Sequence, residues 1–185
     1  MMYCAVNAKI KAMRASGKRD SKALLHYIYD RPQKNFLKIL ATGLNSGRLD
    51  TAYYLQLWRG LNMLDKSSRD ALRRVIGAEI DLQNILWMYR LKRFYGVVGD
   101  ATFAYLIPVG GRLPGEVFVR MANCKDVTAL AAEVLQSPYG GVFNNFTDTN
   151  RAEEKLFKAV KKLYQREICK NSNSIAAVCL FLYER

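Results

Sequence analysis

Apolar residues recur every three or four positions along most of the chain, which is the spacing of amphipathic α-helices. Capping residues precede several of these stretches and glycines follow them, as at helix starts and ends. The pattern predicts helices over residues 3–15, 21–30, 32–43, 51–64, 67–95, 100–106, 125–135, 149–169 and 175–185. Residues 116–120 alternate in the way that favours a strand, and residues 137–145 read as a loop. The sequence therefore predicts an all-α fold.

The longest of these helices carries the most informative pattern. Residues 75–91 are apolar nearly all round the helix, which indicates a core helix enclosed by others. The polar residues that interrupt it are Glu79, Asp81, Gln83, Asn84, Arg90 and Lys92. Glu79 and Arg90 share a stripe about 40° wide but lie about 16 Å apart along the axis, while Asp81 and Lys92 lie on nearly the opposite side. Glu79 and Arg90 cannot pair with each other, so each is expected to find a partner on another helix, because an unpaired buried charge is costly.

Two interpretations of these polar residues remain open. They form either a catalytic carboxylate or ion site, or a structural polar network that fixes the register of the helix; the network is the favoured interpretation. Its members are Glu79, Asp81, Asn84, Arg90 and Lys92. No second carboxylate cluster, nucleophile arrangement or metal-ligand spacing accompanies them elsewhere in the sequence. We therefore predict no catalytic, cofactor-binding or metal-binding residue.

The charge of the chain is its unusual compositional feature. Its 185 residues are 50% hydrophobic, as in ordinary globular proteins, but 29 Lys and Arg against 16 Asp and Glu give a net charge of +13. Residues 1–50 carry 10 basic and 3 acidic side chains and residues 151–185 carry 8 and 4, so the excess comes from the two ends. Such an excess attracts anionic partners, whether nucleic acid, a membrane surface or an acidic protein.

Several kinds of chemistry are disfavoured by the same sequence. Four dispersed cysteines and a single histidine, His26, argue against a zinc site and for reduced thiols in the cytosol. The pairs Gly110-Gly111 and Gly140-Gly141 lack the spacing of nucleotide-binding loops. The longest apolar run, residues 175–183, is shorter than the roughly 20 residues of a membrane-spanning helix. The amino-terminal residues, which carry several charges, do not resemble a signal peptide.

Residues 71–95 resemble the core helices of a known protein family, the C (or d) subunits of V-type and archaeal-type rotary ATPases. Those helices repeat Glu-x-acid-Leu/Ile-x-Asn followed by Arg-x-Lys, which Glu79, Asp81, Leu82, Asn84, Arg90 and Lys92 match one by one. Three further stretches agree in the same order: residues 3–13, Tyr53-Tyr54-x-x-x-Trp58 and residues 173–178. Four motifs in one order make the resemblance fairly specific, and it covers essentially the whole chain.

The resemblance implies a compact multi-helix bundle of repeated helical units, part of a pseudo-threefold funnel. Residues 1–185 would form a single helical domain with subdomains 1–96 and 97–185. The implied function is that of a non-catalytic central-stalk subunit that links the proteolipid rotor ring to the central shaft and passes torque in ion transport. It would need no cofactor, and it would be cytoplasmic, peripheral to the membrane through its complex.

Two further expectations concern the partners. The alternative to the rotary-ATPase function is a basic helical protein that binds nucleic acid, for which we expect only weak binding without sequence specificity. Members of the family are nearly twice as long, and a further family repeat after residue 185 is expected to be absent. If so, apolar residues such as Val178 and Leu182 would lack their usual cover, and the carboxy-terminal helix would promote self-association.

Overall fold

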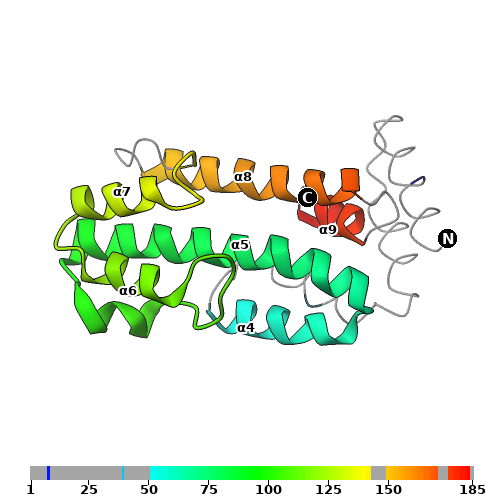
Figure 1. The fold of residues 1–185 in the computed structure, drawn as a ribbon, viewed down its shortest axis with the longest axis horizontal. Helices are drawn as coiled ribbons and strands as arrows, with labels where there is room; N and C mark the ends of the chain where they lie inside the picture. Colours follow the sequence, from blue (N-terminus) through cyan, green and yellow to red (C-terminus); the bar gives the residue numbers. More distant parts are fainter. Residues whose placement is uncertain (1–7, 9–38, 40–50, 143–148, 171–174, 184–185) are drawn as a thin grey trace. The chain divides into compact units, whose positions relative to one another are not determined.

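Every element of the described part of the protein is helical (Figure 1). The computed structural model describes residues 8 and 39 and residues 51–142, 149–170 and 175–183. The elements are α4 (Thr51–Gly60), η1 (Leu61–Met63), α5 (Lys66–Arg90), η2 (Leu91–Tyr95), η3 (Gly99–Tyr105), α6 (Gly115–Asn123), α7 (Val127–Gln136), α8 (Thr149–Lys170) and α9 (Ala176–Tyr183). The predicted all-α fold is confirmed. The helices predicted over residues 3–15, 21–30 and 32–43 lie outside the described residues, except for residues 8 and 39, which are helical.

The chain forms two compact units. The central unit is Arg74–Val160, and the terminal unit combines Met1–Arg73 with Lys161–Arg185. Helices α5 and α8 each begin in one unit and end in the other. These unit boundaries lie after residues 73 and 160. The division into subdomains 1–96 and 97–185 stays a prediction.

Helix α5 is the core helix of the central unit, as its all-round apolar pattern predicts. From Val75 to Leu86 every residue except Gln83 is buried. The remaining buried apolar residues of the unit include Leu106, Ile107, Leu113, Met121, Ala122, Leu130, Val134, Tyr139, Leu156 and Val160. The polar side chains Glu79, Asp81 and Asn84 are therefore enclosed together with the apolar ones.

The ends of the core helix follow local capping chemistry, with one correction. The sequence predicts a start at Ser67, but the cap is Asp65, whose Oδ2 accepts a hydrogen bond from the Ser68 backbone N–H at 3.0 Å. The carboxylate satisfies one of the free N–H groups at the helix start and sets the start one residue earlier. At the other end α5 continues as the π-helical turn η2 and stops at Gly96, whose φ of 63° is left-handed. This end agrees with the helix predicted over residues 67–95, which Gly96 directly follows.

Three sequence predictions need correction in detail. Residues 116–120, the candidate strand, lie within α6. Their short alternation gives way to a helical period, because Met121 and Ala122 are fully buried one turn after Val117 and Phe118. The helix predicted over residues 51–64 ends at Gly60 and tightens into the 3-10 turn η1. The helix predicted over residues 100–106 is the 3-10 helix η3, which covers Gly99–Tyr105.

Apolar residues of α4 and η1 are buried. Tyr54, Leu57 and Leu61 are fully buried, while Trp58 is half-buried with the Arg73 guanidinium 5.7 Å from its ring centroid.

The expectation that Val178 and Leu182 lack cover is wrong, because they are only 1% and 3% exposed. No helix among the described residues is both long and apolar enough to cross a membrane.

Candidate functional site

Asp81 accepts four hydrogen bonds within the central unit. Its Oδ1 accepts a hydrogen bond from the Gly111 N–H at 3.0 Å, and its Oδ2 accepts from the N–H groups of Arg112 at 2.6 Å and Leu113 at 3.1 Å. The Tyr139 hydroxyl donates to the same Oδ2 at 2.8 Å. One buried carboxylate of α5 thus holds two segments that are far apart in sequence.

The protonation of this group follows from its surroundings. Burial raises the pKa of Asp81, and the backbone N–H groups and the Tyr139 hydroxyl oppose that rise by stabilising the carboxylate. All four partners are donors, an arrangement suited to an ionised carboxylate, which only accepts. Burial, and then the neighbouring Asp81 charge, raise the pKa of Tyr139, so its hydroxyl stays protonated and keeps donating.

Asn84 lies one turn further along the same face and binds the start of the same loop. Its Nδ2 donates to the Ile107 carbonyl oxygen at 3.1 Å, and its Oδ1 accepts from the Ile107 N–H at 2.8 Å. The amide therefore pairs with both backbone groups of one residue, as a neighbouring strand would. Because Asn84 is 2% exposed, these bonds form without competing water.

Lys92 binds the carboxyl end of α6. Its Nζ donates to the carbonyl oxygens of Ala122 at 2.7 Å and Cys124 at 2.8 Å. A cation placed there satisfies carbonyls that the helix leaves free, and it complements the helix dipole. Burial lowers the pKa of Lys92, and the nearby Cys124 opposes this shift.

Gly77 and Gly111 allow the loop to lie directly on α5. A Cβ added to Gly77 would lie 2.8 Å from the Gly111 Cα, and one added to Gly111 would collide with the Gly77 backbone carbonyl. Neither glycine has a positive φ, so the requirement is one of space. The sequence carries two indications of such a close contact. Gly77 lies inside a core helix, and Gly110-Gly111 is a glycine pair without the spacing of a nucleotide-binding loop.

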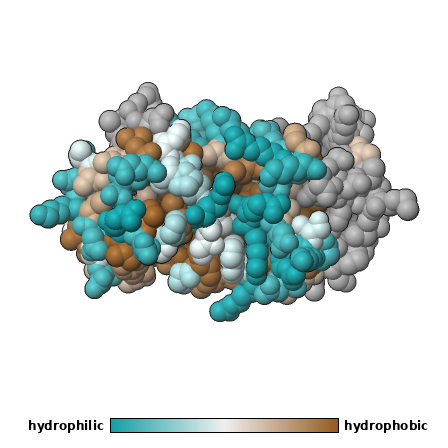
Figure 2. Space-filling view, in the orientation of Figure 1, coloured by the Kyte–Doolittle hydropathy of each residue, from teal (hydrophilic) through white to brown (hydrophobic). Residues whose placement is uncertain are grey.

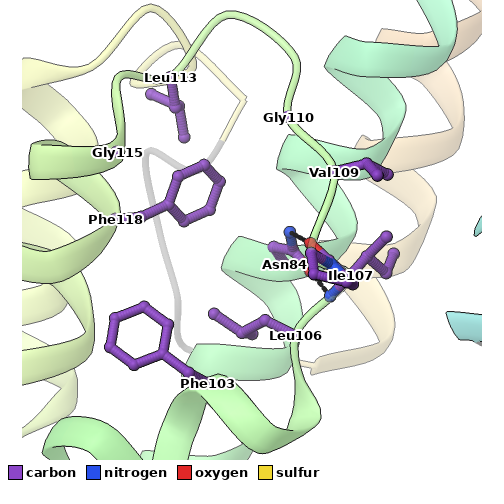
Figure 3. Close-up of a pocket in the computed structure, with 10 residues that line it drawn as sticks. Asn84, Phe103, Leu106, Ile107, Val109, Gly110, Leu113, Gly115 and Phe118 are labelled. Carbon is purple, nitrogen blue, oxygen red and sulfur yellow. Dashed lines mark hydrogen bonds between the residues drawn. The ribbon is translucent and has the colours of Figure 1, made fainter.

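An apolar pocket lies between this loop and the elements η3 and α6. It has a volume of about 320 Å³ and is lined by Asn84, Phe103, Leu106, Ile107, Pro108, Val109, Gly110, Leu113, Gly115 and Phe118. Figure 3 shows Phe103, Phe118, Leu106 and Leu113 turned toward the hollow, while Val109 points away. The wall that carries Leu106 and Leu113 is the segment that Asn84 and Asp81 hold. The shape of the pocket therefore depends on the polar residues of α5.

The predicted polar residues divide into two sets. Asp81, Asn84 and Lys92 all bind the segment between residues 107 and 139. Glu79 is buried and Arg90 is half-buried; both have interaction partners, and neither lines the pocket. Tyr139 is not predicted by the sequence, because it lies in a stretch that reads as a loop. In the described ranges no group of three His, Cys, Asp or Glu residues is arranged to hold a metal ion.

Comparison with known proteins identifies the family. The family model for the ATP synthase (C/AC39) subunit matches residues 7–185. The chain belongs to this family. Members are subunits of V-type ATP synthases, as the motif of α5 indicates.

An uncharacterized protein of Treponema pallidum (strain Nichols) is 40% identical over 50 residues, a stretch that is 27% of this chain and 15% of that protein. No solved structure matches this C/AC39 family member.

Proposed function

We propose that this chain is a non-catalytic coupling subunit that links the proteolipid rotor ring to the central shaft of a V-type ATPase. The observation that carries the proposal is the family match over residues 7–185. A torque-transmitting part must be rigid, and the enclosed α5 with its buried hydrogen bonds supplies such a body within the central unit. The chain would act on the cytoplasmic face and reach the membrane through its complex.

We propose a structural role for the polar residues of the core helix. Glu79, Asp81, Asn84, Arg90 and Lys92 would form a network that fixes the loop and the helices around α5. The bonds of Asp81, Asn84 and Lys92 to backbone groups support this role, because such bonds position segments and offer no free reactive group. Alanine at Glu79 or Arg90 should then lower stability by about 1–4 kcal/mol. Denaturant melts would measure it, and wild-type stability combined with lost assembly would contradict it.

The coupling proposal is tested with the whole ATPase. Cells that lack this chain should yield a complex whose catalytic part still hydrolyses ATP, while ATP-driven ion transport into vesicles is lost. Restoring the full chain should restore transport. Full ion transport without the chain, or failure of the tagged chain to purify with other ATPase subunits, would contradict the proposal.

The charge of the terminal unit favours one alternative. That unit carries 19 basic and 7 acidic side chains, an excess that would attract nucleic acid. Attraction of this kind weakens steeply with salt, so we expect any binding to be lost near physiological ionic strength. Specific binding that persists there would favour the nucleic-acid function instead.

A further inference from the structure

The lining of the pocket in the central unit offers no free polar side chain to a ligand. No ionisable side chain lines it, and the amide of Asn84 is already bonded to Ile107. Phe103 on its wall is 39% exposed, and Gly110 and Gly115 are exposed as well. The pocket is thus an apolar depression that reaches the surface.

Exposed apolar side chains surround the same elements. On η3 and α6, which contribute to the lining of the pocket, these are Phe103, Tyr105 and Val119, each at least 39% exposed. Helices α6 and η3 pack against each other, which brings Val119 and the η3 side chains onto neighbouring elements. Figure 2 shows hydrophobic side chains at the surface on the left of the view, where α6 and α7 lie in Figure 1. Gathered apolar surface of this kind is typical of interaction sites.

The distribution of charge indicates what covers this surface. The central unit carries 10 basic and 9 acidic side chains, whereas the terminal unit carries 19 and 7. Almost the whole net charge of +13 therefore belongs to the terminal unit. The occupant of the pocket meets a nearly neutral unit and an uncharged lining, which fits apolar side chains and disfavours phosphates or acidic peptides.

The size of the pocket limits the occupant further. An apolar cavity of about 150 Å³ holds one benzene-sized group, so about 320 Å³ holds two such groups. A whole helix, with a diameter of about 10–12 Å, does not fit. Side chains one turn apart on a helix have Cβ atoms about 5–6 Å apart, so two of them can enter together.

We propose that the pocket receives two apolar side chains, one turn apart, from an α-helix of another subunit of the ATPase complex. This inference rests on the proposed function, which supplies the partner complex. The docked helix would lie against Phe103 and Phe118, and the exposed apolar residues nearby would surround it. The loop held by Asp81 and Asn84 forms the opposite wall of the pocket.

Blocking the pocket tests the proposal without disturbing the fold. A Cβ at Gly110 or Gly115 meets no atom within 4 Å, and both glycines line the pocket, so Gly110→Leu and Gly115→Leu place side chains at it. Gly141→Leu is the matched control, because Gly141 is equally open but lies outside the lining. The probe is the purified ATPase that lacks this chain, titrated with the full-length protein. Each blocking variant should raise the apparent Kd about tenfold or more at unchanged Tm, and the control should not. Wild-type affinity of both blocking variants would overturn the proposal.

A photo-cross-linking amino acid identifies the occupant. It replaces Phe103, which is 39% exposed at the pocket, or Phe157, which is 42% exposed in α8 outside the lining. In the assembled ATPase, cross-links from position 103 should reach apolar residues on a helix of another subunit, and those from position 157 should not reach that helix. Cross-links from position 103 only to lipid, to a second copy of this chain or to nothing would overturn the pocket proposal while the coupling function stands. A chain absent from the purified ATPase overturns both.

Discussion

The side-chain amide of Asn84 pairs with both backbone groups of Ile107, donating to the carbonyl at 3.1 Å and accepting from the N–H at 2.8 Å. This one side chain fixes where the loop after η3 begins to follow α5. Since the loop also forms one wall of the pocket, the pairing connects the interior of the central unit with its surface.

Asn84→Ala should lower the free energy of unfolding by about 2–3 kcal/mol, because it leaves the N–H and carbonyl of Ile107 buried without partners. Urea denaturation of the purified chain measures the loss. Asn62→Ala is the control: that side chain is exposed and accepts a long bond of 3.5 Å from Arg73, so a change within about 0.5 kcal/mol is expected. Equal effects of the two substitutions would contradict the role of Asn84.

Asp81→Asn should cost about 2–4 kcal/mol although the side chain keeps its size. The asparagine NH₂ group is a donor, and it would face N–H and O–H groups that now donate to the carboxylate. The substitution also removes the negative charge that strengthens those hydrogen bonds. Asp126→Asn is a close control, because Asp126 is exposed and caps α7 by accepting from the Ala129 N–H at 2.8 Å. Asparagine caps helices as well as aspartate does, so that variant should be nearly as stable as wild type. Thermal melts at pH 7 would measure both effects. An Asp81→Asn variant as stable as the wild type would refute the prediction.

Gly111→Ala and Gly110→Ala should differ sharply although the residues are adjacent. The methyl group at Gly111 would strike the Gly77 backbone, whereas at Gly110 it meets open space. We expect Gly111→Ala to cost about 2 kcal/mol or more and Gly110→Ala to change stability by less than about 0.5 kcal/mol. Chemical denaturation of both variants tests this, and a Gly111→Ala protein as stable as wild type would show that the loop can lift off α5 at little cost.

Stability should fall in alkaline solution. Burial raises the pKa of the Cys179 thiol above its ordinary value of 9.0, and burial together with Asp81 raises the pKa of Tyr139 above 10.0. Above these ordinary values the unfolded chain loses protons that the folded chain keeps, so unfolding is favoured as the pH rises. Burial also raises the pKa of Cys124 above its ordinary value of 9.0. The lowered pKa of Lys92 acts in the opposite direction below 10.5, but it is one group against three.

Denaturant titrations between pH 8 and 11 measure this slope. Tyr139→Phe should flatten it above pH 10, because phenylalanine has no proton to lose. A slope that the substitution leaves unchanged would mean that Tyr139 titrates alike in both states. Alkylation gives a second readout: the exposed Cys169 should react at pH 8 while the buried Cys179 does not until the chain unfolds.

Local patterns predict the helices better than the contacts between them. The all-round apolar pattern of α5 marks Asp81 and Asn84 as buried, since a residue on an enclosed helix has no route to water. Their partners are backbone groups of residues 107 and 111–113, and nothing in the residue types of that loop encodes which N–H points inward. Tyr139 is 58 residues from Asp81 in sequence, and only the fold brings it near.

The start of α5 and the helical state of residues 116–120 also depend on neighbouring segments. Asp65 and Ser67 are both suitable caps for α5. Leu64 is extended after the turn η1, and the next residue, Asp65, is the cap. Residues 116–120 alternate like a strand, yet their neighbours Met121 and Ala122 and the Lys92 ammonium at the carboxyl end of α6 favour the helix.

The two anchors of the loop also restrict its length. Asn84 binds the chain at residue 107 and Asp81 binds it at residues 111–113, while the spacing of these two side chains along α5 is set by the helix rise. An inserted or deleted residue between 107 and 111 would leave one anchor without its partner. Surface loops usually vary in length among related proteins. Relatives that keep both anchors should therefore keep this segment free of insertions and deletions, even where their sequences differ widely on either side.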